Sequence, residues 1–165
     1  MQYLKVDYKN LNIEEELCLT IGNLDGIHKG HNKILEKLKK EARSLNAKSA
    51  ILSFDPHPKF YFDNSQRFLI NSKQKKINIL EQKNIDYLID LKFNQELIDL
   101  SYSDFENKIL YENLNLKKIL IGNDFRYGNK RKGDIETLKS FCEKASILYE
   151  NIDLLEDDKI GRAHV

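Results

Sequence analysis

The chain has 165 residues and a mass of 19.4 kDa, with 41% hydrophobic and 32% charged residues; this is the size and composition of one globular domain and excludes a disordered chain. Its 27 basic and 26 acidic side chains leave a formal net charge of +1, which argues against a dedicated nucleic-acid-binding protein. No apolar run approaches the roughly 18 residues of a membrane helix, and residues 1–10 lack the apolar segment of a secretory signal. Cys18 and Cys142 lie too far apart for a metal or redox motif, so we expect a cytoplasmic protein with no membrane or nucleic-acid partner.

Short apolar runs alternate along the chain with helical patterns. The apolar runs predict strands at residues 17–21, 49–54, 87–93, 117–121 and 145–149. Apolar side chains at helical spacing predict helices at residues 31–45, 73–83, 101–114 and 134–144. Ser101 or Ser103 is the expected N-cap of the third helix. Strands that are apolar throughout, separated by amphipathic helices, indicate an α/β fold, a Rossmann-like doubly wound parallel sheet of about five strands.

Unusual residues follow three of the predicted strands, at residues 22–31, 55–58 and 122–128. In open parallel sheets, ligands bind beyond the carboxyl ends of the strands. These three segments are therefore the places where a binding site is expected.

The first segment holds three glycines and two histidines immediately before a predicted helix. Gly22, Gly26 and Gly30 allow close backbone approaches that side chains forbid. A helix that begins there presents free N–H groups to an anion, and His28 and His31 are close enough in sequence for one turn to bring both imidazoles to a phosphate. The segment therefore predicts a nucleotide-phosphate site, with a purely structural turn as the alternative.

Two other interpretations of the first segment fail. A zinc site lacks partners, because the remaining histidines are His57 and His164 and no cysteine lies nearby in the sequence. A dinucleotide-binding fingerprint fails because the glycine spacing is not G-x-G-x-x-G.

The second segment, Asp-Pro-His-Pro at residues 55–58, holds both prolines of the chain. Two rigid residues fix the backbone path, so the segment is either a stiff strand exit or a shaped wall that presents His57. In the second case Phe60, Tyr61 and Phe62 could stack on a planar ligand.

The third segment combines polar and aromatic residues with a basic run. Asp124 could bind Mg²⁺ or orient a substrate hydroxyl, and Asn123 and Asp124 could equally form a turn. The basic residues are Arg126, Lys130, Arg131 and Lys132. Such a run is usually solvated surface, but its place after a strand favours anion contact.

Together the three segments resemble a known family. Residues 20–31, T-I-G-N-L-D-G-I-H-K-G-H, are similar to the HxGH motif of the nucleotidyltransferase superfamily. F-D-P-H-P at 54–58 and G-N-D-F-R-Y-G at 122–128, followed by Arg131 and Gly133, narrow the resemblance to the FMN adenylyltransferase module of the bacterial bifunctional FAD synthetases (riboflavin kinase/FMN adenylyltransferase). The resemblance covers nearly the whole chain.

The resemblance implies an enzyme that transfers AMP from ATP to FMN, giving FAD and pyrophosphate, with Mg²⁺ as cofactor. The FMN phosphate attacks the α-phosphorus directly, so catalysis needs alignment and charge stabilisation more than a protein nucleophile. The residues implied in catalysis are His28, His31, Asn23 and Asp124. The residues implied in binding ATP and its phosphates are Gly22, Asp25, Gly26, Gly30, Arg126 and Arg131. The residues implied on the flavin side are Asp55, His57, Pro58, Phe62 and Tyr127. Asp124 is also the candidate metal ligand.

The chain departs from the family pattern in three places. Leu24 and Tyr127 stand where the family usually has phenylalanine, and both changes keep an apolar side chain. At the end, the family has a segment like I-S-S-T-x-I-R that supplies Ser, Thr and Arg to the ATP phosphates. Here residues 160–165 read I-G-R-A-H-V, which one frame of a common sequencing adapter also encodes. We therefore expect an adenylyltransferase domain at 1–159, a non-native tail at 160–165, and a riboflavin kinase domain only in the full-length protein.

Two alternatives to this function stay open, and a third is excluded by length. A related nucleotidyltransferase would act on NMN, phosphopantetheine or glycerol phosphate. A fragment without catalysis would bind nucleotide or flavin through the glycine-rich segment. A class I tRNA synthetase also carries an HxGH-like motif, but it needs a far longer chain with an RNA-binding domain. The leading interpretation predicts small-molecule substrates only.

Overall fold

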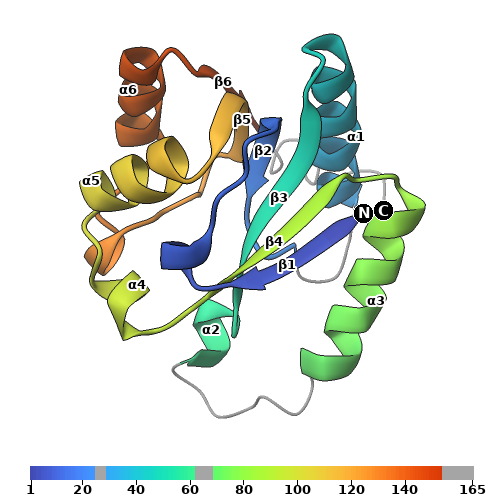
Figure 1. The fold of residues 1–165 in the computed structure, drawn as a ribbon, viewed down its shortest axis with the longest axis horizontal. Helices are drawn as coiled ribbons and strands as arrows, with labels where there is room; N and C mark the ends of the chain where they lie inside the picture. Colours follow the sequence, from blue (N-terminus) through green and yellow to red (C-terminus); the bar gives the residue numbers. More distant parts are fainter. Residues whose placement is uncertain (25–28, 62–68, 154–165) are drawn as a thin grey trace, which may run out of the picture.

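A computed structural model describes residues 1–24, 29–61 and 69–153 of the chain (Figure 1). The strands are β1 (Gln2–Val6), β2 (Glu16–Ile21), β3 (Lys48–Asp55), β4 (Tyr87–Lys92), β5 (Asn115–Gly122) and β6 (Leu148–Ile152). The helices are α1 (Lys29–Ser44), α2 (Pro58–Tyr61), α3 (Leu69–Gln82), α4 (Gln95–Asp99), α5 (Tyr102–Asp104), the π-helix η3 (Phe105–Glu112) and α6 (Ile135–Ala145). Two short 3₁₀ turns are η1 (Tyr8–Asn10) and η4 (Asn129–Arg131). The predicted tail at 160–165 lies outside the described residues.

The strands of the described residues form one six-stranded sheet in the order β1-β4-β3-β2-β5-β6, with every neighbouring pair parallel. The predicted parallel Rossmann-like sheet is therefore confirmed, with one more strand than expected. The extra strand is β1, which lies at the edge beside β4. None of its side chains is fully buried, so it lacks the continuous apolar run by which the other strands were predicted.

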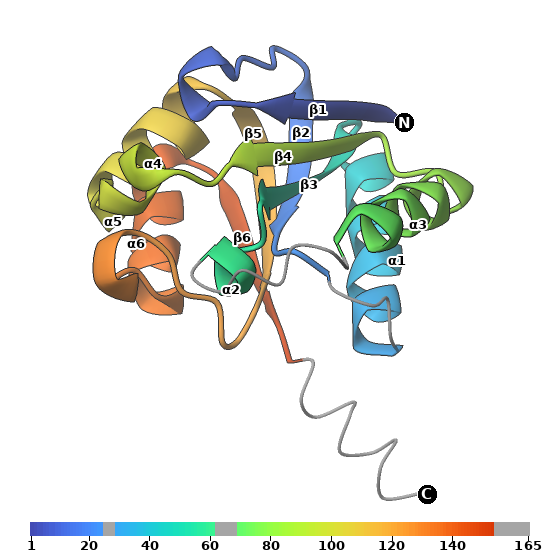
Figure 2. The ribbon, with the colours of Figure 1, turned by 90° about the horizontal axis from the view of Figure 1, so that it is seen from below.

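Helices cover both faces of the sheet, as a doubly wound fold requires (Figure 2). Successive side chains of a strand point to opposite faces. In β2, Leu17, Leu19 and Ile21 pack into the core that faces α4, η3 and α6, whereas Cys18 packs into the core that faces α1 and α3. Two separate apolar cores therefore hold the layers together.

The helix ends follow local capping, and they explain one wrong boundary. Ser101 caps α5 as predicted, since its hydroxyl accepts a hydrogen bond of 3.0 Å from the Asp104 N–H. Asp134 forms a capping box with Thr137 at the start of α6. This helix ends at Ala145, where Ser146 takes a left-handed conformation, so the last strand begins at Leu148 and the prediction of a strand at 145–149 was placed too early.

The strand order puts three carboxyl ends side by side. From the central β2 the chain moves to β3 on one side and later returns to β5 on the other. This reversal is the topological switch point at which open α/β sheets bind ligands.

No helix of the described ranges has the length and apolar character that crossing a bilayer requires.

Candidate functional site

The three unusual segments leave the sheet at neighbouring strands. Gly22 follows the end of β2, Asp55 is the last residue of β3, and Gly122 is the last residue of β5. Because β3, β2 and β5 are adjacent and parallel, their carboxyl ends lie together. The expectation that the segments follow the strand ends is confirmed, and all three reach the switch point.

The start of α1 lies at the same end of the sheet. This helix begins at Lys29, so Gly30 and the half-buried His31 lie in its first turn, as the phosphate-site prediction requires. The Asn32 Oδ1 atom is buried and accepts no hydrogen bond from any described residue, and such acceptors normally have a partner. Four predicted site residues lie outside the described ranges, namely Asp25, Gly26, His28 and Phe62.

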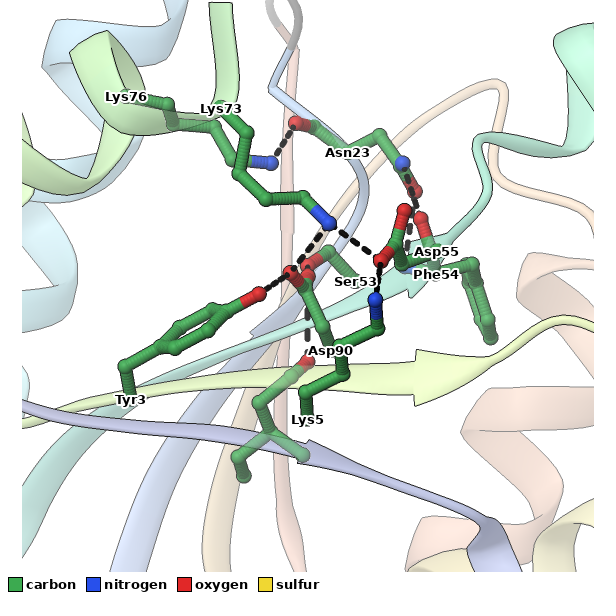
Figure 3. Close-up of polar contacts among 10 residues, drawn as sticks. Tyr3, Lys5, Asn23, Ser53, Phe54, Asp55, Lys73, Lys76 and Asp90 are labelled. Carbon is green, nitrogen blue, oxygen red and sulfur yellow. Dashed lines mark hydrogen bonds and ion pairs between the residues drawn. The ribbon is translucent and has the colours of Figure 1, made fainter. Parts of the chain in front are cut away.

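Asn23 joins the first segment to the second. Its Nδ2 donates to the Phe54 carbonyl at 2.8 Å, and its Oδ1 accepts from the Phe54 N–H at 3.2 Å. Lys76 Nζ donates to the Asn23 carbonyl at 2.8 Å (Figure 3). Both ends of the Asn23 amide are therefore bound to backbone and tie the loop after β2 to β3, and its predicted catalytic role stays a prediction.

The Asp55 carboxylate is held by lysines from two different elements (Figure 3). Lys5 of β1 lies 3.0 Å from Asp55 Oδ2, and Lys73 of α3 forms a shorter ion pair with the same oxygen. Burial alone raises the pKa of the Asp55 carboxyl, but its bonds to the two ammonium groups outweigh burial and bring the pKa below its usual range. Asp55 is therefore an ionised anchor at the start of the Asp-Pro-His-Pro segment.

A second, fully buried carboxylate lies beneath Asp55. Asp90 of β4 is 1% exposed, and Lys73 Nζ lies 3.7 Å from its Oδ2. The Tyr3 hydroxyl donates to Asp90 Oδ2 at 2.7 Å and the Ser53 hydroxyl donates to Oδ1. Burial, followed by the hydrogen bond to Asp90, raises the pKa of Tyr3. Two lysines thus neutralise two aspartates in one network, as buried charges require.

The rest of the second segment turns sharply after β3. The Asp55–Pro56 peptide bond is cis, and the half-buried His57 precedes α2, its carbonyl accepting from the Tyr61 N–H at 2.9 Å. The Tyr61 ring lies edge-on to Phe93, with centroids 5.3 Å apart. Tyr61 is therefore packed against the protein, which agrees with the stiff strand exit, while the wall that presents His57 to a ligand stays a prediction.

The third segment begins with a tight turn. The Phe125 N–H donates to the Gly122 carbonyl at 3.3 Å, which makes Asn123 and Asp124 turn residues with exposed side chains. Arg126 is exposed and lies 3.7 Å from Asp134. Arg131 is exposed as well and adopts a positive φ of 54°. The turn alternative is therefore correct for the backbone, and it leaves the Asp124 carboxylate accessible.

Tyr127 is buried in the apolar core that faces η3 and α6. It is 5% exposed, and its ring stacks on Phe125 with centroids 5.3 Å apart and contacts Phe105. Its hydroxyl hydrogen-bonds to Glu106 and lies 2.9 Å from Thr137 Oγ1. Burial raises the pKa of Tyr127, and burial also raises the pKa of the Glu106 carboxyl. The Tyr127 ring therefore supports the loop from inside, and its predicted flavin contact stays a prediction.

No group of three His, Cys, Asp or Glu side chains suited to a metal ion occurs within residues 1–24, 29–61 and 69–153. A cleft of about 660 Å³ lies between η3 and α6, and none of the predicted site residues lines it. The candidate site is therefore defined by the three segments and the start of α1.

Sequence reasoning missed the network that holds the second segment. Lys73 and Lys76 belong to α3, which carries none of the unusual segments, and exposed lysines are the norm on an amphipathic helix. One signal was present: Asp90 interrupts the apolar run Tyr-Leu-Ile-Asp-Leu at residues 87–91. A charged residue in a strand covered on both faces needs a partner.

Comparisons with known proteins agree with the family resemblance of the three segments. A sequence model of the FAD synthetase family matches residues 11–162. The bifunctional riboflavin kinase/FMN adenylyltransferase of Buchnera aphidicola subsp. Schizaphis graminum is 35% identical over 148 residues, which are 84% of this chain and 47% of that protein. The protein of the same name from Haemophilus influenzae is 31% identical over 153 residues, 92% of this chain and 49% of that protein. The chain thus spans about half the length of these curated relatives.

A solved structure is similar in fold. The macrolide-efflux protein from Streptococcus pneumoniae superposes with a TM-score of 0.76 at 19% identity, over 93% of this chain and 51% of that chain. At this identity the likeness shows the fold alone.

Proposed function

Because the chain belongs to the FAD synthetase family, we propose that it transfers AMP from ATP to FMN, giving FAD and pyrophosphate. The observation that carries the proposal is the meeting of three segments at one switch point: the loop after β2 with the start of α1, the Asp-Pro-His-Pro segment after β3, and the loop after β5. This is where a doubly wound sheet binds a nucleotide.

The reaction is a direct displacement at phosphorus. A phosphate oxygen of FMN forms a bond to the α-phosphorus of ATP, and the bond from that phosphorus to the bridging oxygen breaks, so that pyrophosphate leaves. His31 and the free N–H groups at the start of α1 stabilise the charge on the transferring phosphoryl group. His28 has the same role in this proposal, and Gly30 lets the phosphate approach the helix backbone.

The nucleotide side of the proposed site lies between β2 and β5. In this proposal Gly22, Asp25 and Gly26 bind ATP, and Arg126 and Arg131 contact its phosphates from the loop after β5. Both arginines are exposed. Mg²⁺ is usually held by one or two carboxylates together with substrate phosphates.

The exposed Asp124 suits that kind of metal site. No hydrogen bond or ion pair to another described residue engages its carboxylate, as the contacts within the described ranges show. In this proposal Asp124 is the protein ligand of an ion that ATP brings, and the ion supplies charge neutralisation at the phosphates.

The flavin side of the proposed site is the segment after β3. Asp55 anchors it, His57 and Pro58 border the FMN phosphate, and Phe62 is the proposed stacking partner of the ring. The two cysteines are free and buried, which suits a reducing compartment such as the cytoplasm. In the full-length protein we propose a riboflavin kinase domain as the source of FMN.

The test is FAD formation by the purified chain supplied with FMN, ATP and Mg²⁺, followed by chromatography. FAD should form with the wild type and fall at least tenfold with His31→Ala, the order expected when one stabilising group is lost at a transferring phosphate. Parallel reactions with NMN, phosphopantetheine and glycerol phosphate in place of FMN should give no adenylylated product.

Two results would contradict the proposal. An adenylylated product with another phosphate but none with FMN would identify a related nucleotidyltransferase. Binding of FMN, seen as quenched flavin fluorescence, without FAD from the chain as given or from a chain extended by an Ile-Ser-Ser-Thr-x-Ile-Arg segment would identify a binding module without catalysis.

A further inference from the structure

Helix α3 carries none of the three site segments, yet it contacts two of them. Lys73 and Lys76 are three residues apart, so both project from the same side of the helix. Figure 3 shows the two ammonium groups directed to different loops, Lys73 to Asp55 and Lys76 to Asn23. One rigid element therefore touches the segment after β3 and the segment after β2.

Lys73 is the stronger of the two cations on Asp55. Its side chain is 27% exposed, compared with 61% for Lys5, and exposed ion pairs are weakened by water and salt. Lys73 also reaches the buried Asp90, which Tyr3 and Ser53 hold in place. Lys73 therefore links Asp55 at the end of β3 to the buried Asp90 inside the sheet.

Lys76 acts on the other segment. Its Nζ donates to the carbonyl of Asn23, the residue directly after Gly22, and the Asn23 amide in turn bonds to the backbone of Phe54, next to Asp55. The two segments are therefore linked to each other and, separately, to α3. These three links, between the two segments and from each segment to α3, restrict both the separation and the orientation of the segments.

We propose that Lys73 and Lys76 are positioning residues that set the relative position of the FMN-binding and ATP-binding loops. Lys73 holds the loop on the flavin side, and Lys76 holds the loop on the nucleotide side. The inference rests on the proposed function, in which the reacting atoms come from substrates held by different loops. In-line transfer needs those atoms about 3–3.5 Å apart, and a misplacement of about 1 Å costs roughly a hundredfold in rate.

Both aspartates keep other contacts when Lys73 is removed. Asp90 retains its bonds from Tyr3 and Ser53, and Asp55 retains Lys5. Removal of Lys73 should therefore loosen the second segment, and it should also lower the free energy of unfolding, because the buried Asp90 loses its cation. Lys75 lies on the same helix, is exposed, and serves as the matched control.

The experiment compares Lys73→Met, Lys76→Met and Lys75→Met in one chain. Hydrogen exchange is followed at residues 55–61 and 22–24, and KM is measured separately for FMN and ATP. Both variants should lower kcat about tenfold or more, because the reacting atoms are misaligned. In addition, Lys73→Met should raise KM for FMN about tenfold or more with KM for ATP changed less than about twofold, whereas Lys76→Met should do the reverse. Exchange should accelerate only in the segment that each lysine holds.

Rescue and control variants decide between positioning and general destabilisation. Lys73→Arg should recover most of the FMN affinity, because a guanidinium can still pair with Asp55, and Lys75→Met should match the wild type. An active wild type whose Lys73→Met and Lys76→Met variants behave like Lys75→Met would overturn the inference and leave the proposed function standing. A wild type that makes no FAD and binds neither substrate would overturn the proposed function and the inference with it.

Discussion

Gly128 should be the glycine of the third segment that tolerates a side chain least. Its φ of 79° and ψ of 175° lie in a region that essentially only glycine occupies. A Cβ atom built there would lie 2.6 Å from both Cα and N of Tyr102, which are backbone atoms of α5. The Asn129 N–H also donates to the Leu100 carbonyl at 2.7 Å, so the loop cannot move away without losing that bond.

The cost of Gly128→Ala follows from these two effects. The backbone conformation contributes about 1–3 kcal/mol and the collision about 1–3 kcal/mol, so the free energy of unfolding should fall by about 2–6 kcal/mol. At about 4 kcal/mol, Tm should fall by about 8–16 °C for a chain of this size. Urea and thermal unfolding of the purified variant measure both quantities.

Gly133→Ala is the matched control. Its Cβ would lie 2.8 Å from the Tyr102 Cβ and from ring atoms of the buried Tyr127, so the collision is of the same kind, but its φ is not in the positive range reserved for glycine. We expect a loss of about 1–3 kcal/mol from overpacking alone. A Gly128→Ala variant as stable as Gly133→Ala, or more stable, would refute the reasoning from backbone conformation.

Three further predictions concern the cores and the site. Leu38→Ala, at a fully buried position, should lower the free energy of unfolding measured by urea titration by about 2–5 kcal/mol. The exposed control Lys40→Ala should change it by about 0.5 kcal/mol or less. Equal effects of the two substitutions would mean that α1 does not bury Leu38. Burial raises the Glu106 pKa above its ordinary 4.5, so folding favours the protonated carboxyl. The stability of the wild type relative to the non-ionising Glu106→Gln variant should therefore be full below pH 4.5 and be lost as the pH rises through the pKa of the folded state. A difference in stability between the two proteins that does not change with pH would contradict the raised pKa. Asn23→Ala should cost about 1–3 kcal/mol of stability, since both amide bonds to the β3 backbone are lost, and it should slow FAD formation; unchanged stability would show that the bonds to β3 contribute nothing.

The sheet was predictable because its central strands carry a local signal. In β3, Ile51 packs toward α1 and α3 while Leu52 packs into the opposite core, so both faces demand apolar residues and the run is continuous. The edge strand β1 has one neighbour and no such run. General rules of handedness and connection restrict the possible strand orders, but the order that places the three segments together comes from the structure.

The roles of individual site residues depended on partners far away in the sequence. The sequence does not show that the Asn23 amide is bound to the backbone of Phe54. It does not show either that Glu106 and Thr137 hold the Tyr127 hydroxyl inside the core. No local pattern records such contacts.

The measurement that tests the central claim most directly follows the phosphorus itself. The purified chain receives FMN, Mg²⁺ and ATP labelled at the α-phosphorus, and in a parallel reaction ATP labelled at the γ-phosphorus. Direct adenylyl transfer predicts the α-label in FAD and the γ-label in pyrophosphate, with both signals lost in His31→Ala. The γ-label in a flavin product, or FAD formation that His31→Ala leaves unchanged, would contradict the proposed site and its chemistry.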